Sequence, residues 1–454
     1  MTTPLTVFDI LEYGASDLAL GTVNRAAIVA AIAAASPVGG QVWIPPIGTY
    51  AVDVTAGPIA VPPGVTIRGS SARYRASRIT HYGGGILFDL DGGFETRRIS
   101  GIVIRGGALG SVGIRVRASG TKLDHITFDR YTGAAGIHFV NGDGPDADGP
   151  WLCRADNIDV ECLETTPGTG SGLDYGIRCG AKWNGSSITN SSASGCKKAG
   201  IYIEGGAGSQ IRNVAVGEND VGEADTVGIL VTAGTALMID GIESEGNYSA
   251  GLRVVSVDGL VVTGFYDNPN GYRRCAPYSI DIQGGTSITV IGGGPFNSAA
   301  TAGIRVTGGA GVSLLGVPTN ATVSGAIGVR LDNSALSLNG PAAITGKATL
   351  SAGARSITGN TGTIQHGAWT TIFNPVSVCG TLGAGMFLVM ANHLDSADGK
   401  ATTTILADRT YASERGTSNA AVQLRLDGSN NVQVQQNYGV AQNVQWGYLF
   451  VPIT

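Results

Sequence analysis

The central part of the chain carries carboxylates at spacings that suit acid–base chemistry on β-strands. Asp159 and Glu161 are two residues apart, so on a strand both would point from one face. Aligning segments 123–126 and 155–158 puts Asp129 level with Glu161, which predicts Cβ atoms about 5 Å apart on adjacent strands. Carboxylates about 5 Å apart suit a retaining glycoside hydrolase, and a wider pair suits an inverting one. Asp129, Asp159 and Glu161 are therefore the first candidates for a pair with one protonated and one ionised carboxyl.

A second acidic pair lies further along the chain. Glu243 and Glu245 repeat the spacing of two residues, but no long loop lies beside them. They are second-choice carboxylates for the same chemistry. For both pairs the alternative is a solvated acidic face of a sheet that carries out no reaction.

Three other residues suggest a different reaction. His138, Arg178 and Tyr202 occupy the same place in a repeated phrase, in which glycine is followed by an apolar residue, any residue and an apolar residue. A polysaccharide lyase needs a cation that neutralises a uronate carboxylate and a base that removes the α-proton, and this set contains both kinds of group. The alternative is an arginine-rich ladder that lines a subunit interface or binds acidic groups without chemistry.

Aromatic residues near the carboxylates are candidates for sugar binding. Trp151 and Trp183 flank the segment with the longest loops, and Tyr131 lies two residues after Asp129. Aromatic faces stack on sugar rings, so we expect platforms here. The alternative is that these side chains pack inside their own loops.

Neither a metal nor a cofactor is predicted. The acidic loop 141–150, with Asp143, Asp146 and Asp148, lacks the full spacing of an EF-hand calcium loop. The chain also lacks a P-loop, a nucleophile elbow, zinc-ligand spacing and a dinucleotide-binding fingerprint.

The repeated phrase identifies the elements that position these residues. It starts at Gly113, Gly136, Gly176, Gly200, Gly228, Gly251, Gly303 and Gly328, with Ser279 standing in once. Most intervals are 23 to 28 residues, a period that predicts stacked coils of a β-solenoid. One interval is 40, so the coil from 136 to 176 carries two long loops, 141–150 and 164–171. Long loops on a rigid scaffold usually build a binding wall, so this coil is the first place to look for a site.

A second phrase recurs once per coil and brings asparagines into line. Asn157, Asn190 and Asn213 fall at one position of neighbouring coils. Stacked side-chain amides both donate and accept hydrogen bonds along a solenoid, so we predict a structural amide ladder here.

The N-terminal segment carries a specific resemblance. Residues 7–15 end in Tyr13-Gly14-Ala15, residues 24–35 form an Ala- and Ile-rich helix with Ile28 and Ile32 on one face, and residues 39–50 contain two glycines, two prolines and Gly-Thr-Tyr. This order is similar to the N-terminal cap of the pectate-lyase-like right-handed β-helices, a superfamily that includes phage tailspikes and tail fibres. The family's Asp-rich segment before the helix is replaced here by residues 16–22.

The sequence predicts an all-β chain with four parts: a cap at 1–50, a right-handed parallel β-helix at 51–345, a linker at 346–364 and a C-terminal β-sandwich at 365–454. Segments 422–426 and 432–434 alternate apolar and polar residues across a turn-rich stretch and predict a hairpin. The resemblance implies that the last domain serves trimerisation or glycan contact.

Composition narrows the class of partner. Glycine numbers 71 of 454 residues, far above the usual share of about 7%, which indicates many tight turns. A net charge of −5 argues against nucleic acid. Six cysteines without CxxC spacing predict free thiols. Residues 1–17 contain no basic residue, so no signal peptide is predicted there. The apolar stretch 26–35 is too short to cross a bilayer.

Together these features predict a function. The resemblance implies a homotrimeric tailspike of a phage or prophage virion tail, joined to baseplate or tail proteins, which binds a bacterial surface polysaccharide. Hydrolysis by paired carboxylates is the expected reaction. A lyase that uses the basic column and a non-catalytic receptor-binding fibre are the alternatives.

Overall fold

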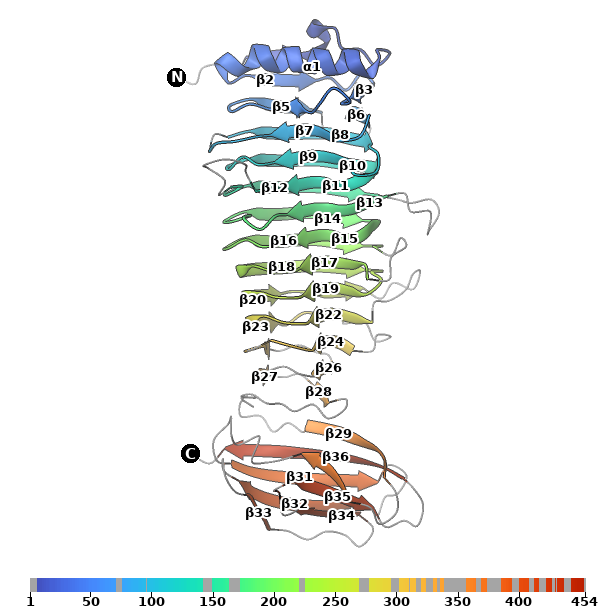
Figure 1. The fold of residues 1–454 in the computed structure, drawn as a ribbon, viewed down its shortest axis with the longest axis vertical. Helices are drawn as coiled ribbons and strands as arrows, with labels where there is room; N and C mark the ends of the chain where they lie inside the picture. The colour runs from blue at the N-terminus through green and yellow to red at the C-terminus, as the bar shows by residue number, and fades with distance from the viewer. Residues whose placement is uncertain are drawn as a thin grey trace. The chain divides into compact units, whose positions relative to one another are not determined.

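The computed structural model describes residues 6–315 except 71–75, 95, 142–148, 163–171, 220–224, 269–276, 295–301 and 310, and beyond 315 it describes strands β26 to β36 with Ser429 and Asn431. The chain divides into two compact units, one of residues 1–280 with 295–301 and the other of residues 281–294 with 302–454. Figure 1 shows the order of the elements within each unit.

A helix covers the first coil of the N-terminal unit. Strand β1 (Val7–Asp9) and the 3-10 helix η1 (Ile10–Tyr13) precede α1 (Gly21–Ala35), which η2 (Ser36–Val38) extends. Ile28 and Ile32 on the inner face of α1 are 0% and 5% exposed. Because a solenoid's end coil would otherwise expose its core, this helix acts as the predicted cap.

The same helix is long and apolar enough to cross a membrane by length and composition alone, over Gly21–Val38. A helix that covers a protein core passes the same test, so the finding is weak evidence for a span.

The first sheet of this unit consists of parallel strands, one from each coil. Their order is β1, β2 (Gln41–Ile44), β5 (Thr66–Gly69), β8 (Arg98–Gly106), β10 (Lys122–Tyr131), β12 (Arg154–Glu161), β14 (Ser187–Ser194), β16 (Gln210–Gly217), β18 (Thr235–Glu245) and β20 (Asp258–Thr263). β3 (Thr49–Asp53) pairs with β6 (Ser77–Tyr82), β6 with β8, and β21 (Tyr266–Asn268) with β18.

The second sheet contains the repeated phrase, and its register is the predicted one. It is formed by β4 (Ile59–Ala60), β7 (Ile86–Leu90), β9 (Val112–Val116), β11 (Gly133–Phe139), β13 (Leu173–Cys179), β15 (Cys196–Ile203), β17 (Val227–Val231) and β19 (Ala250–Val254). Ile114, Ile137, Ile177 and Ile201 are register partners and wholly buried. The glycine before each isoleucine is required by space, since a Cβ atom on Gly136 would lie 2.9 Å from the carbonyl oxygen of Gly176.

Each long strand of the first sheet has a left-handed residue at one register position that the coils share, and the strand bends there. The bend falls at Gly101, His125, Asn157, Asn190, Asn213 and Gly241, with φ between +49° and +68°. Glycine and asparagine adopt this region at little cost, which explains why they recur there. The bend divides each strand into an arm before it and an arm after it.

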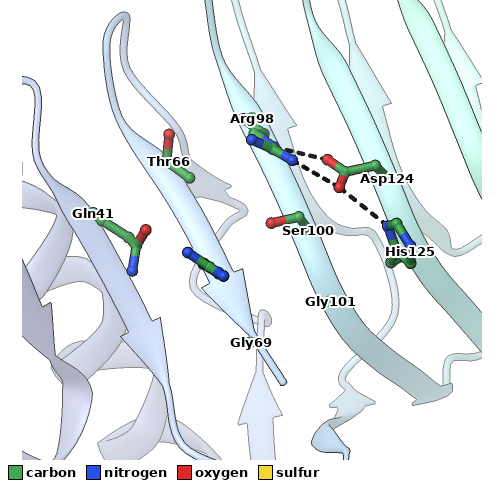
Figure 2. A pocket seen from close by; sticks show the side chains of 9 residues that line it. Gln41, Thr66, Gly69, Arg98, Ser100, Gly101, Asp124 and His125 are labelled. Atoms are coloured by element: carbon green, nitrogen blue, oxygen red, sulfur yellow. Dashed lines mark hydrogen bonds and ion pairs between the residues drawn. The ribbon is translucent and has the colours of Figure 1, made fainter. Parts of the chain in front are cut away.

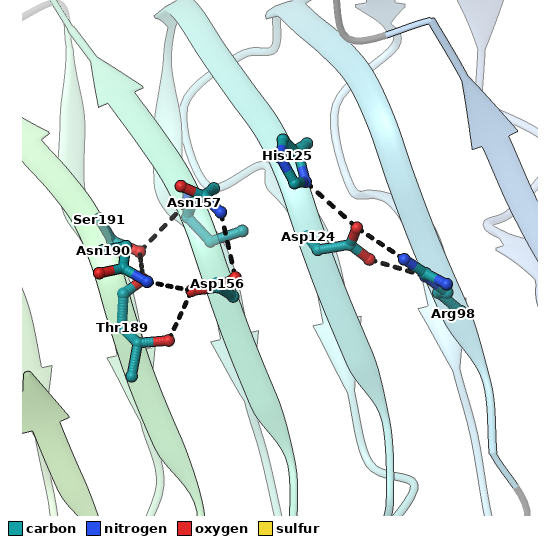
Figure 3. Close-up of polar contacts among 9 residues, drawn as sticks. Arg98, Asp124, His125, Asp156, Asn157, Thr189, Asn190 and Ser191 are labelled. Atoms are coloured by element: carbon teal, nitrogen blue, oxygen red, sulfur yellow. Dashed lines mark hydrogen bonds and ion pairs between the residues drawn. The ribbon is translucent and has the colours of Figure 1, made fainter.

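The predicted amide ladder is present in part, and Figure 3 shows the step at which Asp156 takes the place of a direct amide contact. Asn213 Nδ2 donates to Asn190 Oδ1 at 2.7 Å, which confirms one step of the ladder. The next step is different, because Asn190 Nδ2 donates to Asp156 Oδ1 at 2.8 Å and Asn157 Nδ2 donates to Asp156 Oδ2 at 3.0 Å. A carboxylate with two acceptor oxygens takes both amides, so the direct Asn157–Asn190 contact is replaced.

Four cysteines are free and buried, in agreement with the prediction: Cys153, Cys162, Cys179 and Cys196. Burial raises the pKa of the Cys153 thiol to about 12. Cys275 and Cys379 lie outside the described residues.

The C-terminal unit begins with parallel strands. β22 (Tyr278–Ile282) spans the division between the units, and β23 (Thr286–Ile291), β24 (Ala302–Val306), β25 (Ser313–Leu315), β26 (Asn320–Val323), β27 (Arg330–Asp332) and β28 (Ala335–Leu338) follow. Asp281 is fully buried and receives two hydrogen bonds of 2.7 Å from Arg305.

Antiparallel strands complete this unit: β29 (Ile357–Ile364), β30 (Trp369–Phe373), β31 (Gly385–His393), β32 (Lys400–Ala407), β33 (Ala412–Arg415), β34 (Val422–Leu426), β35 (Val432–Gln436) and β36 (Gln442–Pro452). β34 and β35 form the predicted hairpin. The strands make two sheets, β29-β36-β31-β32-β33 and β30-β35-β34, in the manner of a β-sandwich. β29 occupies the end of the segment that was predicted to be a linker.

Candidate functional site

The first-choice carboxylates lie together on the arms that follow the bend. Asp129 of β10 is the register partner of Glu161 of β12, and Asp159 is the partner of Thr127. Phe128 and Val160 point into the core, so the residues that alternate with them point outward. The alignment that placed Asp129 level with Glu161 is therefore confirmed.

The three carboxylates have different surroundings. Asp129 accepts hydrogen bonds from Arg105, which is its register neighbour on β8, at 2.5 Å from Nε and also from Nη2. Asp159 accepts a hydrogen bond from Ser192 Oγ. Glu161 is exposed and makes no hydrogen bond or ion pair with any residue that the structure describes. One carboxylate is thus paired with a cation while its neighbour is open to solvent.

The second-choice carboxylates occupy the same two columns three strands further on. Register runs from Asp159 through Ser192 and Ala215 to Glu243, and from Glu161 through Ser194 and Gly217 to Glu245. The residues between the two acidic strands all have small side chains. The two acidic pairs therefore lie at the two ends of a strip of small side chains, formed by Ser192, Ser194, Ala215 and Gly217.

The loops predicted to wall this surface cannot be placed, because residues 142–148 and 163–171 lie outside the described residues. Asp143, Asp146 and Asp148 belong to the first of them. Among the residues that the structure does describe, no group of three or more His, Cys, Asp or Glu side chains could hold a metal ion.

The basic and aromatic column is assembled as predicted on the second sheet. His138, Arg178 and Tyr202 are successive register partners. Arg178 forms an ion pair with Glu204 through Nη2, and its guanidinium lies 5.6 Å and 5.8 Å from the ring centroids of Tyr175 and Tyr202. The two rings stack at 4.8 Å. Since Glu204 already neutralises Arg178, this cation is not free to neutralise a uronate.

His138 is held neutral in this column. Burial, together with the nearby charges of Arg178 and Arg115, lowers its pKa to about 4. A neutral imidazole can accept a proton at pH 7, but its low pKa makes it a weak base for carbon acids.

Two of the predicted aromatic platforms are wrong. Tyr131 is 1% exposed and Trp183 is 0% exposed, so neither offers a face to a sugar ring. Arg130 has a φ of +52°, and this second bend breaks the strand alternation and turns Tyr131 inward, where its hydroxyl lies 2.7 Å from His81 Nδ1. Trp183 follows the second sheet and packs against Phe139 at a centroid distance of 6.2 Å.

Trp151 remains partly accessible. Its ring meets the 64%-exposed side chain of Phe94 edge to face at 5.7 Å. Trp151 as a sugar platform therefore stays a prediction, which the structure allows.

Sequence reasoning missed a polar groove of about 400 Å³ over β2, β5, β8 and β10 (Figure 2). It includes Arg98, whose guanidinium binds Asp124 with two hydrogen bonds of 2.8 Å and 2.9 Å. The signal was available in the sequence, because continuing the second phrase toward the N-terminus places Arg98 and Asp124 on adjacent strands.

No protein-family profile and no curated protein sequence matches the chain. The tailspike protein of Acinetobacter phage vB_ApiP_P1 is similar in structure at 13% identity and a TM-score of 0.37, over 98% of this chain and 87% of that chain. A mutant tailspike protein of E. coli bacteriophage HK620 in complex with a pentasaccharide gives 11% and 0.43 over 98% and 93%.

The likeness is one of fold. PfbA, a surface adhesin of Streptococcus pneumoniae, is similar at 13% identity and a TM-score of 0.48, over 91% of this chain and 99% of that chain. At such identities no residue role passes from these proteins to this solenoid, so its site has to be argued from its own side chains.

Proposed function

We propose that the chain is a phage or prophage tailspike that binds a bacterial surface polysaccharide (capsule, exopolysaccharide or O-antigen) and hydrolyses it at Asp129, Asp159 and Glu161. The observation that supports this most is the pairing of Asp129 with Glu161 on an outward face, one carboxylate bound to Arg105 and the other open. Two carboxyl groups in contrasting surroundings are the usual basis for dividing acid and nucleophile roles.

In this proposal Glu161 donates its proton to the glycosidic oxygen as the bond to the leaving sugar breaks. Asp129 is about one strand spacing away, roughly 5 Å, which suits attack on the anomeric carbon and a retaining reaction. Water then releases the sugar from Asp129 as Glu161 takes the proton back. Asp159 lies two residues along the strand, about 7 Å from Glu161, which suits activation of water and an inverting reaction. The configuration of the product distinguishes the two.

The strip between the acidic pairs supports binding of an extended polymer. Ser192, Ser194, Ala215 and Gly217 leave the backbone close to the surface, so a glycan can lie across several strands without meeting large side chains. Trp151 is proposed as a separate aromatic contact, because it precedes β12 whereas the strip crosses the end of that strand.

The test uses purified capsular, exopolysaccharide and O-antigen preparations and measures new reducing ends. Glu161→Gln should abolish cleavage while the polymer is still retained. Glu245→Gln is the matched control, because Glu245 stands in the same register column, and it should leave cleavage unchanged. If Glu161→Gln cleaves at the normal rate, Glu161 is not the acid, and loss of activity in Glu245→Gln would move the site to Glu243 and Glu245.

A non-catalytic receptor-binding fibre is the second candidate. The stacked rings of Tyr175 and Tyr202 with Arg178 beside both favour it, since such a cluster can hold a sugar without providing a reactive group. It predicts polymer retention with no change in polymer size over long incubation. The lyase alternative predicts instead an unsaturated uronate that absorbs ultraviolet light, and a loss of that product in Tyr202→Phe.

Assembly as a homotrimer attached to phage baseplate or tail proteins belongs to the same proposal. Sedimentation equilibrium of the purified chain should give three times the mass of 46.1 kDa. A monomer at micromolar concentration would contradict the trimer.

A further inference from the structure

The polar groove lies on the arms that precede the bend, near the cap. It lies where two coils carry glycine, Gly101 at the bend and Gly69 at the same register position, whereas the next two coils carry His125 and Asn157 there. A Cβ atom on Gly69 would lie 2.5 Å from the carbonyl oxygen of Gly101, and Gly101 has a φ of +68°. His125 closes the groove on the side of the later coils, as Figure 2 shows.

The groove is lined in part by polar side chains that make no hydrogen bond with the described residues. Gln41 and Ser100 are only 7% and 6% exposed, and both line the groove together with Thr66. Within the described part of the chain, none of these three side chains makes a hydrogen bond. The polar atoms of these three side chains are not among the buried atoms that lack a partner, so they open onto the groove and are available to a ligand.

The charges of the groove do not balance. Arg98 is neutralised by Asp124, and the His125 Nδ1 atom also lies 3.2 Å from that carboxylate. Burial alone would raise the pKa of Asp124, but the hydrogen bonds from Arg98 and His125 lower it below its usual value. Arg68 is exposed in the same groove and has no ion pair or hydrogen bond with any described residue. One guanidinium is therefore left over for an anionic ligand.

We propose that this groove binds a carboxylate-bearing sugar unit, with Arg68 paired to the carboxylate and Gln41, Thr66 and Ser100 bonded to hydroxyls. The inference rests on the proposed function only in that the ligand is a glycan. The planar fork of arginine matches a carboxylate with two hydrogen bonds. A volume near the lower end for ligand sites fits a small ligand, and several neutral groups beside one free cation fit a singly charged sugar better than a bare anion.

The groove is separate from the acidic pair although it uses the same strand. Asp124 and Asp129 both belong to β10, but His125 at the bend stands between them. A ligand in the groove thus contacts the arm before the bend, while cleavage is proposed on the arm after it.

The experiment titrates the full chain with trigalacturonate, its methyl ester and inorganic phosphate, followed by calorimetry or ligand-observed NMR. Trigalacturonate should bind at least about tenfold more tightly than the uncharged ester, and Arg68→Gln should lose about tenfold in affinity, as expected for one charge-assisted contact. Arg212→Gln is the control, because Arg212 stands in the same register column as Arg68 and is also exposed, but it lies outside the groove and pairs with Asp240 at 3.5 Å. This variant should bind normally.

Three results would overturn the inference: no binding of trigalacturonate to the unmodified chain, equal binding of the ester, or an Arg68→Gln variant that binds as well as the unmodified chain. Inorganic phosphate that binds as tightly as trigalacturonate would also overturn the inference, because a site for a bare anion needs no sugar. Glu161→Gln should bind trigalacturonate normally, because Glu161 lies outside the groove. If whole polysaccharide is retained but Arg68 is irrelevant, this inference fails and the proposed function stands. If trigalacturonate binds but no polysaccharide is retained, this inference stands and the proposed function fails.

Discussion

At the left-handed bend of β18, one substitution should stabilise the protein. Gly241 has a φ of +63°, and a Cβ atom there would lie 3.6 Å from the nearest atom, the backbone nitrogen of Asn213, which is ordinary van der Waals contact. Gly241→Asn should therefore fit, and its amide would stand level with Asn213 as Asn213 stands level with Asn190. We expect it to donate to Asn213 Oδ1 and extend the ladder by one coil.

The magnitude follows from two contributions. Replacing glycine lowers the entropy of the unfolded chain, worth about 0.4 to 1 kcal/mol, and asparagine accepts the left-handed region at little cost. An exposed amide hydrogen bond adds about 0.5 kcal/mol. Gly241→Asn should thus stabilise by about 1 kcal/mol. Gly241→Ala receives the same entropy term, but the left-handed region costs alanine about 1 to 2 kcal/mol, so this variant should be destabilised by about 1 kcal/mol.

The assay is urea unfolding of the three proteins side by side, followed by far-ultraviolet circular dichroism. The two variants should move the midpoint in opposite directions. Equal shifts in one direction would refute the reasoning, because then neither the backbone region nor the amide ladder decides which residue suits the bend.

Two further predictions concern stability. Burial lowers the pKa of His81 to about 4, so between about pH 6.5 and pH 4 the unfolded chain binds more protons than the folded one. The free energy of unfolding should therefore fall as the pH falls, by about 3 kcal/mol for this residue. Urea unfolding at several pH values should show a smaller loss of stability in His81→Gln, and an identical dependence on pH would contradict the assignment. Gly195→Ala would place a Cβ atom on the carbonyl oxygen of Cys162. Gly110 has a similar positive φ but open space around it, so the Gly195→Ala variant should unfold at a much lower temperature than Gly110→Ala. Equal thermal midpoints of the two variants would rule out the clash.

Register was predictable from the sequence because each coil repeats the same local constraint. A glycine that must approach the next coil and an isoleucine that fills the core mark one position per turn. Once that position is known, residues such as Asp129 and Glu161, or His138 and Arg178, can be compared as neighbours. The structure confirms both pairings.

What the sequence could not reveal depended on departures from strand alternation and on ion pairing. Strand alternation predicts an outward Tyr131 because it lies two residues after Asp129, but the left-handed backbone at Arg130 turns this side chain inward. The ion pair between Arg178 and Glu204 was equally hidden, since it joins a strand to the residue that follows the next strand. The groove was missed because it is defined by missing side chains at Gly69 and Gly101.

The shared bend in β10 also bears on how such a chain can change over time. A coil is the unit in which a solenoid gains or loses length, since each one pairs only with its neighbours. Duplicating a whole coil between β10 and β12 would part Asp129 from Glu161 and leave the groove over β2, β5, β8 and β10 untouched. Duplicating a coil between β12 and β18 would preserve both and lengthen only the distance to Glu243 and Glu245. The bent strand thus allows the proposed groove and the proposed carboxylate pair to change independently of each other.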